Sequence, residues 1–181
     1  MKRWRIRLLA AAALAAAAVA AGCGSSETAT TTTSAKAWAS GLCGAVSTYV
    51  QALKHTAGTF KGNPTSAGLD QARAEAKSAT DSFKATVKGL GRPETGSGKQ
   101  AKQALDALGS QLSKDAETMK AATDSVNGTE GLLNAVSVVT GTLATAKTQI
   151  TTTVDELRSL EHGELKDAFA GADSCTVLAQ D

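Results

Sequence analysis

Hydrophobic residues recur at intervals of three and four along most of the chain beyond residue 34, which is the spacing of a helix with one apolar face. A possible N-terminal cap, Ser34, precedes the first run. The run itself consists of Trp38, Leu42, Val46, Tyr49 and Leu53. The segment HTAGTFKGNP follows directly and carries two glycines and a proline. We therefore expect the first helix to end in this segment.

Two further runs follow with their own boundary signals. Pro64 suits the first turn of the second helix, and Gly91 stands where a left-handed C-terminal cap would, with Pro93 two residues later. Ser97 and Gln100 fit a capping box at the start of the third helix. The apolar positions are Leu69, Ala72, Ala76, Ala79, Phe83, Val87 and Leu90 in the second run, and Ala101, Leu105, Leu108, Leu112, Ala116, Met119, Ala122 and Val126 in the third.

A fourth run begins after the turn NGTEG. Its apolar positions are Leu132, Val136, Val139, Leu143, Ala146, Ile150, Val154 and Leu157. Threonine and Gly141 weaken helix propensity here, and the piece VSVVTGT would also suit a strand. The helical period holds for more than about twenty residues, which is far longer than a usual strand. We therefore predict a helix, followed by a short fifth helix with Leu165 and Phe169 that leads to Cys175.

Four amphipathic helices with short connections predict an all-α fold, an antiparallel up-down four-helix bundle with a short C-terminal fifth helix. In this topology the start of the first helix and the end of the fourth lie at the same end. Cys43, in the second or third turn of the first helix, would then lie within reach of Cys175. The bundle domain is expected to comprise residues 35–181.

The N-terminal segment, residues 1–22, has the pattern of a secretion signal. Four basic residues stand in MKRWRIR, and the apolar stretch LLAAAALAAAAVAA follows. Its length of about fourteen residues suits a signal peptide and falls short of the roughly 20 that span a membrane. Removing residues 1–22 leaves 15 basic against 17 acidic residues, so the formal net charge changes from +2 to −2.

The sequence Ala20-Ala21-Gly22-Cys23 resembles a bacterial lipobox, with Ala20 where Leu is usual. This resemblance implies that Cys23 becomes the first residue of the mature protein and carries the lipid on its sulfur. The alternative is an ordinary secretory signal that leaves Cys23 as a free thiol. Residues 23–34 then form the lipidated cysteine and a Ser/Thr-rich linker, which we expect to be flexible.

With Cys23 assigned to the lipid, Cys43 and Cys175 remain. Two cysteines outside the cytosol favour a disulfide, which would pin the fifth helix to the first. Two separate buried thiols are the alternative. A zinc site is not expected, because there is no CxxC spacing and no neighbouring histidine.

Candidate chemistry is sparse. The two histidines, His55 and His162, are expected at opposite ends of the bundle, so we interpret them as helix-terminal residues and not as a metal or catalytic pair. The segment EHGELKD could bind a divalent cation weakly, although a solvated helix junction explains it as well. Nucleic-acid binding is not expected without a basic stripe interleaved with aromatic residues. We expect no cofactor, no metal and no enzymatic activity.

The spacing W-x4-C at Trp38 and Cys43 and the terminal LKDAFAGADSC resemble small alanine- and threonine-rich lipoproteins of high-GC actinobacteria. The resemblance covers the whole chain and implies no particular activity. We therefore expect a lipoprotein anchored by its N-terminal lipid to the outer face of the bacterial cell membrane, with a non-enzymatic helical domain that binds a protein partner. A carrier or sensor of a small apolar ligand or lipid, held between the helices, is the alternative.

Overall fold

The computed structural model describes residues 32–62, 64–160 and 163–176. The predicted signal segment 1–22, Cys23, most of the linker and His162 lie outside the described residues. Four long helices make up most of the molecule: α1 (Ala35–Gly62), α2 (Ser66–Leu90), α3 (Gly98–Asp124) and α4 (Gly128–Ser159). Two short helices follow, α5 (Gly163–Ala170) and α6 (Asp173–Thr176). The predicted all-α bundle is confirmed.

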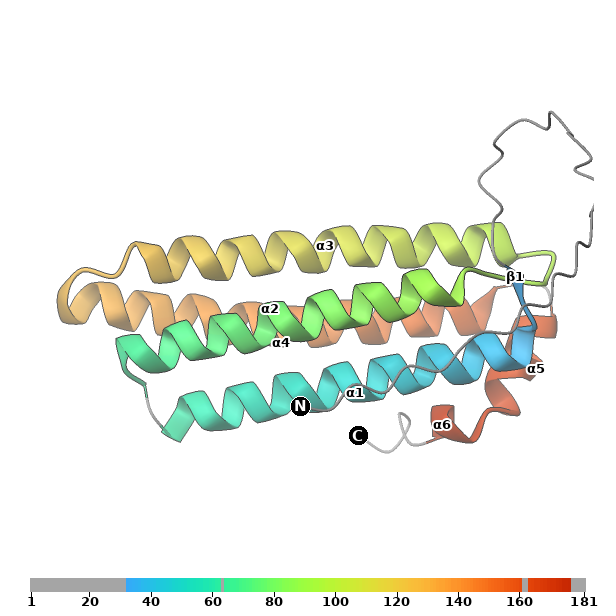
Figure 1. Ribbon diagram of the computed structural model, residues 1–181, viewed down its shortest axis with the longest axis horizontal. Helices are drawn as coiled ribbons and strands as arrows, with labels where there is room; N and C mark the ends of the chain where they lie inside the picture. Colours follow the sequence, from blue (N-terminus) through green and yellow to red (C-terminus); the bar gives the residue numbers. More distant parts are fainter. Residues whose placement is uncertain (1–31, 63, 161–162, 177–181) are drawn as a thin grey trace, which may run out of the picture.

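The long helices run up and down as expected. Each packs against the next along the chain, and α4 also contacts α1 and α2. Figure 1 shows the start of α1, the end of α4 and both short helices at the right end of an elongated bundle. The short helix α5 contacts α1 and α4, and α6 contacts α1 and α5. The C-terminal segment therefore folds back over the end at which α1 begins.

The predicted apolar faces meet in one core. Large side chains from all four long helices lie at its centre with almost no exposure, among them Trp38, Leu69, Leu112 and Ile150. Alanines fill many of the remaining interior positions. Because an alanine buries little area, each contact adds little to stability at about 25 cal/mol per Å².

The threonine-rich fourth run is a helix and not a strand, which confirms the decision based on its period. Its hydroxyl groups find acceptors within the helix itself: Thr142, Thr148 and Thr151 donate to the carbonyl groups four residues earlier at 2.8, 3.2 and 3.1 Å. These bonds satisfy the side chains locally. The helix tolerates threonine for this reason, while its apolar face decides where it packs.

α1 ends at Gly62, within the segment HTAGTFKGNP as predicted, and Thr56 and Phe60 near its end are buried against the rest of the bundle. Two predicted helix starts were wrong. Pro64 lies outside α2, whose cap is Thr65, the acceptor of a bond from the Gly68 amide at 3.1 Å. The expected capping box of α3 does not form, since the Ser97 side chain makes no capping hydrogen bond.

A two-residue parallel ladder, which the sequence did not predict, joins the start of α1 to the α2–α3 connection. Strand β1 (Thr32–Thr33) belongs to the predicted linker and pairs with β2 (Arg92–Pro93). The Thr33 hydroxyl donates to the Leu90 carbonyl at 2.7 Å, and the Trp38 indole donates to the Gly91 carbonyl at 3.2 Å. Gly91 has the positive φ expected of a glycine at the end of α2, but its φ of 65 and ψ of −141 lie outside the left-handed helical region, so the predicted left-handed cap does not form.

Candidate functional site

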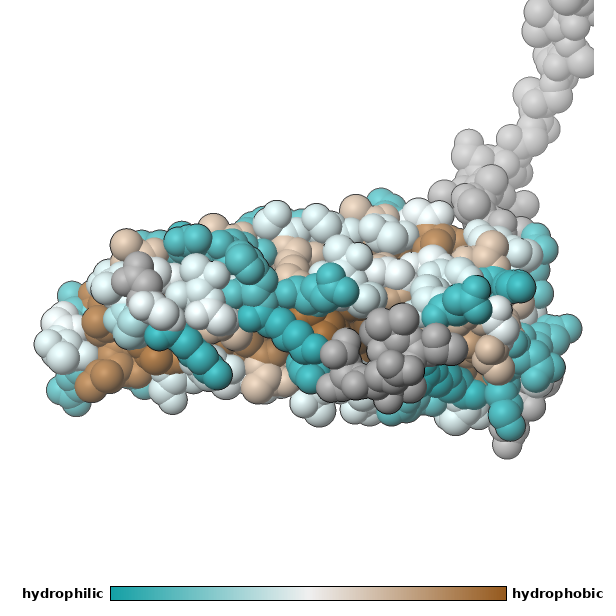
Figure 2. All heavy atoms as spheres, turned by 90° about the horizontal axis from the view of Figure 1, so that it is seen from below, coloured by the Kyte–Doolittle hydropathy of each residue, from teal (hydrophilic) through white to brown (hydrophobic). Residues whose placement is uncertain are grey.

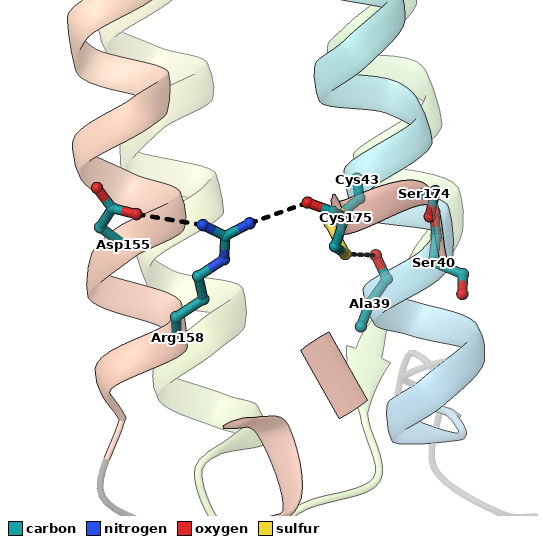
Figure 3. Close-up of a disulfide and its surroundings, with 7 residues drawn as sticks. All are labelled: Ala39, Ser40, Cys43, Asp155, Arg158, Ser174 and Cys175. Atoms are coloured by element: carbon teal, nitrogen blue, oxygen red, sulfur yellow. Dashed lines mark hydrogen bonds and ion pairs between the residues drawn. A yellow bond between two sulfur atoms is a disulfide. The ribbon is translucent and has the colours of Figure 1, made fainter. Parts of the chain in front are cut away.

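The disulfide between Cys43 and Cys175 is present, with the two Cα atoms 5.1 Å apart and both side chains buried. It joins α6 to the third turn of α1 across 132 residues of sequence. Hydrogen bonds surround it (Figure 3): the Ser174 hydroxyl donates to the Ser40 carbonyl at 3.1 Å, and Arg158 donates to the Cys175 carbonyl at 3.4 Å. The C-terminal segment is thereby held to both α1 and α4.

An aromatic contact supports the same end. The rings of Trp38 and Phe169 meet edge to face with their centroids 6.2 Å apart, and the Arg158 guanidinium lies 5.9 Å from the centre of the Phe169 ring. In the W-x4-C spacing, the tryptophan contacts α5 and the cysteine is bonded to α6. The motif that carried the resemblance therefore has a structural role, because it is the surface of α1 that receives the C-terminal segment.

A groove of about 640 Å³ lies between α1 and α2, and Glu75 is the one carboxylate in its lining. α1 contributes small side chains from Gly41 to Thr56, and α2 contributes residues from Glu75 to Thr86. No charged residue occurs between positions 37 and 53 of the sequence. Tyr49 and Phe83 line the groove and contact each other with their ring centroids 5.3 Å apart. The groove thus offers methyl groups, hydroxyl groups and aromatic surface.

Three titratable groups line this groove, namely Tyr49, His55 and Glu75. The Glu75 carboxylate already accepts hydrogen bonds from the Thr56 hydroxyl at 3.0 Å and from the Gln71 amide at 2.9 Å. His55 is exposed on α1, and it lies inside the helix and not at its end as predicted. A carboxylate that already accepts two hydrogen bonds is a poor general base for a neighbouring nucleophile.

A polar layer crosses the bundle with one side chain from each long helix. On one side, Thr80 of α2 donates to the Ala76 carbonyl at 2.9 Å, so the buried Tyr49 hydroxyl is left to donate to Thr80 at 3.0 Å. On the other side, Asp115 of α3 faces Gln149 of α4. Burial raises the pKa of Asp115, and a hydrogen bond from the Gln149 amide opposes the shift.

The Asp115–Gln149 half of the layer is incompletely satisfied. Asp115 Oδ2 and Gln149 Oε1 are both buried, and neither has a hydrogen-bond partner. Two acceptors without a donor cost free energy, whereas a protonated carboxyl could donate to the amide oxygen. Sequence reasoning passed over both residues by assigning the neighbouring Ala116 and Ile150 to the core.

The weak cation site in EHGELKD is not established. Glu161 and His162 lie outside the described residues, while Glu164 and Asp167 are exposed on α5. In the described part of the chain, no group of three or more His, Cys, Asp or Glu side chains could hold a metal ion. None of the described helices combines the length and the apolarity needed to cross a membrane.

Comparison with models of protein families, with curated proteins and with solved structures found no match to this chain. The resemblance to actinobacterial lipoproteins therefore stays a prediction, carried by the W-x4-C spacing and the terminal LKDAFAGADSC.

Proposed function

We propose that this protein is a lipid-anchored lipoprotein on the outer face of a bacterial cell membrane, and that its helical domain works by binding a protein partner. The signal-like residues 1–22 and the lipobox-like segment ending at Cys23 support the anchor. The Cys43–Cys175 disulfide fits an oxidising compartment, where such bonds persist.

The α1–α2 groove is the observation that carries the binding role. It is lined mostly by small side chains, so the backbone of a partner helix could approach α1 and α2 closely. An amphipathic helix laid into a hydrophobic groove is a recurrent mode of recognition. Tyr49 and Phe83 are each only 3% exposed, so the small side chains would supply most of the contact area.

Exposed hydrophobic surface at the other end of the bundle agrees with a binding role. Figure 2 shows hydrophobic residues at the left end, which Figure 1 places opposite α5. Leu133, near the start of α4, is a large hydrophobic side chain with 65% exposure. Surface of this kind is typical of contact sites when it forms a patch.

Site-specific photo-crosslinking in intact cells tests this function. A photoreactive residue at Thr48, which lines the groove, should capture a discrete protein. A photoreactive residue at Thr140, which is exposed on α4 and lines none of the hollows described, is the matched control. Capture of a protein at Thr48 but not at Thr140 supports the proposal. Capture of lipid alone at Thr48 would favour the apolar-ligand alternative, and identical products at both positions would contradict a binding groove.

A further inference from the structure

A second groove, between α2 and α3, has a different character because it is basic. It has a volume of about 730 Å³. Its charged lining residues are Lys84, Lys88, Lys102, Lys114, Asp106 and Glu117. Four cations therefore face two carboxylates, in a chain whose formal charge is nearly balanced at 19 basic against 17 acidic residues. The sequence did not predict this concentration, since the lysines come from two helices.

The ion pairs among the described residues leave most of this charge unneutralised. Lys102 pairs with Asp106 at 2.6 Å, whereas Lys84 donates to the neutral Ser113 hydroxyl at 2.6 Å. Lys88 and Lys114 are exposed and take part in no ion pair within the described part of the chain. A groove with unpaired cations on both walls attracts an anionic partner.

The basic groove begins at the end of the bundle where the chain arrives from Cys23. Lys88 is in the last turn of α2 and Lys102 is near the start of α3. The ladder between Thr32 and Arg92 joins the start of α1 to this corner. Two more exposed cations, Arg92 and Lys99, stand beside it. Figure 1 shows β1 between the start of α1 and the α2–α3 connection.

Covalent geometry limits how far this corner can be from a lipid on Cys23. Thr32 comes nine positions after Cys23, and a fully extended chain covers at most about 3.3–3.6 Å per residue. The corner at Thr32 is therefore within about 30 Å of the attachment atom. Anionic headgroups attract each nearby Lys or Arg enough to strengthen binding roughly fivefold.

We infer that the α2–α3 groove docks onto anionic lipid headgroups of the membrane that holds the anchor. This inference rests on the proposed lipid anchor and adds an orientation to it. The α2–α3 face meets the bilayer, and the bundle lies along the surface instead of standing away from it. The attraction is electrostatic, so high salt should weaken the docking.

Hydrogen–deuterium exchange on the lipidated, full-length mature protein tests the inference. The protein is reconstituted in vesicles of phosphatidylcholine alone and of phosphatidylcholine with a quarter phosphatidylglycerol. We expect the peptides that cover residues 84–114 to exchange several-fold more slowly with phosphatidylglycerol, and 0.5 M NaCl to remove the difference.

Matched charge reversals provide the control. The double variant Lys88→Glu/Lys114→Glu should lose the slowing caused by phosphatidylglycerol. The double variant Lys61→Glu/Lys147→Glu changes the net charge by the same amount, but on α1 and α4, away from the groove. It should keep the slowing caused by phosphatidylglycerol. Thermal unfolding of each variant in phosphatidylcholine checks that the fold is intact.

The outcomes separate this inference from the proposed anchor. Equal exchange in the two kinds of vesicle, with the protein still vesicle-bound, would overturn the docking while leaving the anchor in place. If both double variants lost the slowing of exchange to the same extent, the slowing would depend on net charge alone, and this result would also overturn the docking. A protein that is not acylated and separates from both kinds of vesicle would contradict the anchor itself, and the docking with it.

Discussion

Removing the disulfide should destabilise the domain strongly, and the variant Cys43→Ala/Cys175→Ala is the cleanest perturbation. Alanine suits both positions, because both sulfurs are buried and alanine introduces no polar atom there. The substitution leaves Cys23 and the rest of the chain unchanged.

The magnitude follows from the length of chain that the bond closes. The two cysteines are 132 residues apart. Closing a loop of that size removes enough conformational entropy from the unfolded chain to stabilise the fold by about 5 kcal/mol. For a domain of about 150 residues, this corresponds to a fall in the melting temperature of roughly 10–20 °C.

Thermal unfolding followed by far-ultraviolet circular dichroism measures the effect. The double variant and the reduced wild type should melt at similar temperatures, both well below that of the oxidised wild type. Melting within about 2 °C of the oxidised protein would refute the reasoning that an alanine-rich core depends on this bond. Loss of signal from α5 and α6 alone, with the main transition unmoved, would refute it as well.

Two further predictions concern the core and the helices. Because its folded pKa is raised, Asp115 contributes stability below its unfolded pKa of about 3.9 and loses that contribution as the pH rises through the folded value. Asp115→Asn should therefore stabilise the protein at pH 7, and less so at pH 4; solvent screening keeps the effect small because Asp115 is only partly buried. Asp106→Asn, an exposed control, should not stabilise it. Equal effects of the two substitutions in urea titrations would contradict this. Gly141→Ala should stabilise the protein by up to about 1 kcal/mol, since its new methyl group meets no atom. Gly98→Ala should destabilise it, because the new methyl group would collide with the Pro93 carbonyl oxygen in β2. Melting curves that show the reverse order of stability would disprove the packing at these positions.

Periodicity predicted the helices and their buried faces well, because burial of an amphipathic face depends on spacing alone. It predicted the starts of helices less well. Pro64 was expected in the first turn of the second helix, but α2 begins at Ser66 with Thr65 as its cap. Ser97 has the sequence of a cap, yet its backbone is turned so that the side chain does not reach the helix amides. Local signals of this kind give way to tertiary packing.

The polar layer could have been found from the same spacing. Thr80 lies four residues after Ala76 and three before Phe83, and Asp115 lies three after Leu112 and four before Met119. Both positions belong to the interior face, where a polar residue is unusual and worth attention. The α2–α3 groove had no such signal, because its lysines come together only when two helices pack.

The most direct test of the central claim is intact-mass and peptide mass spectrometry of the mature protein extracted from membranes under non-reducing conditions. We predict a chain that begins at Cys23 with a diacylglyceryl group on its sulfur, and a disulfide-linked peptide pair containing Cys43 and Cys175. A released protein with an unmodified Cys23 would contradict the anchor, and free thiols at Cys43 and Cys175 would contradict the closed bundle.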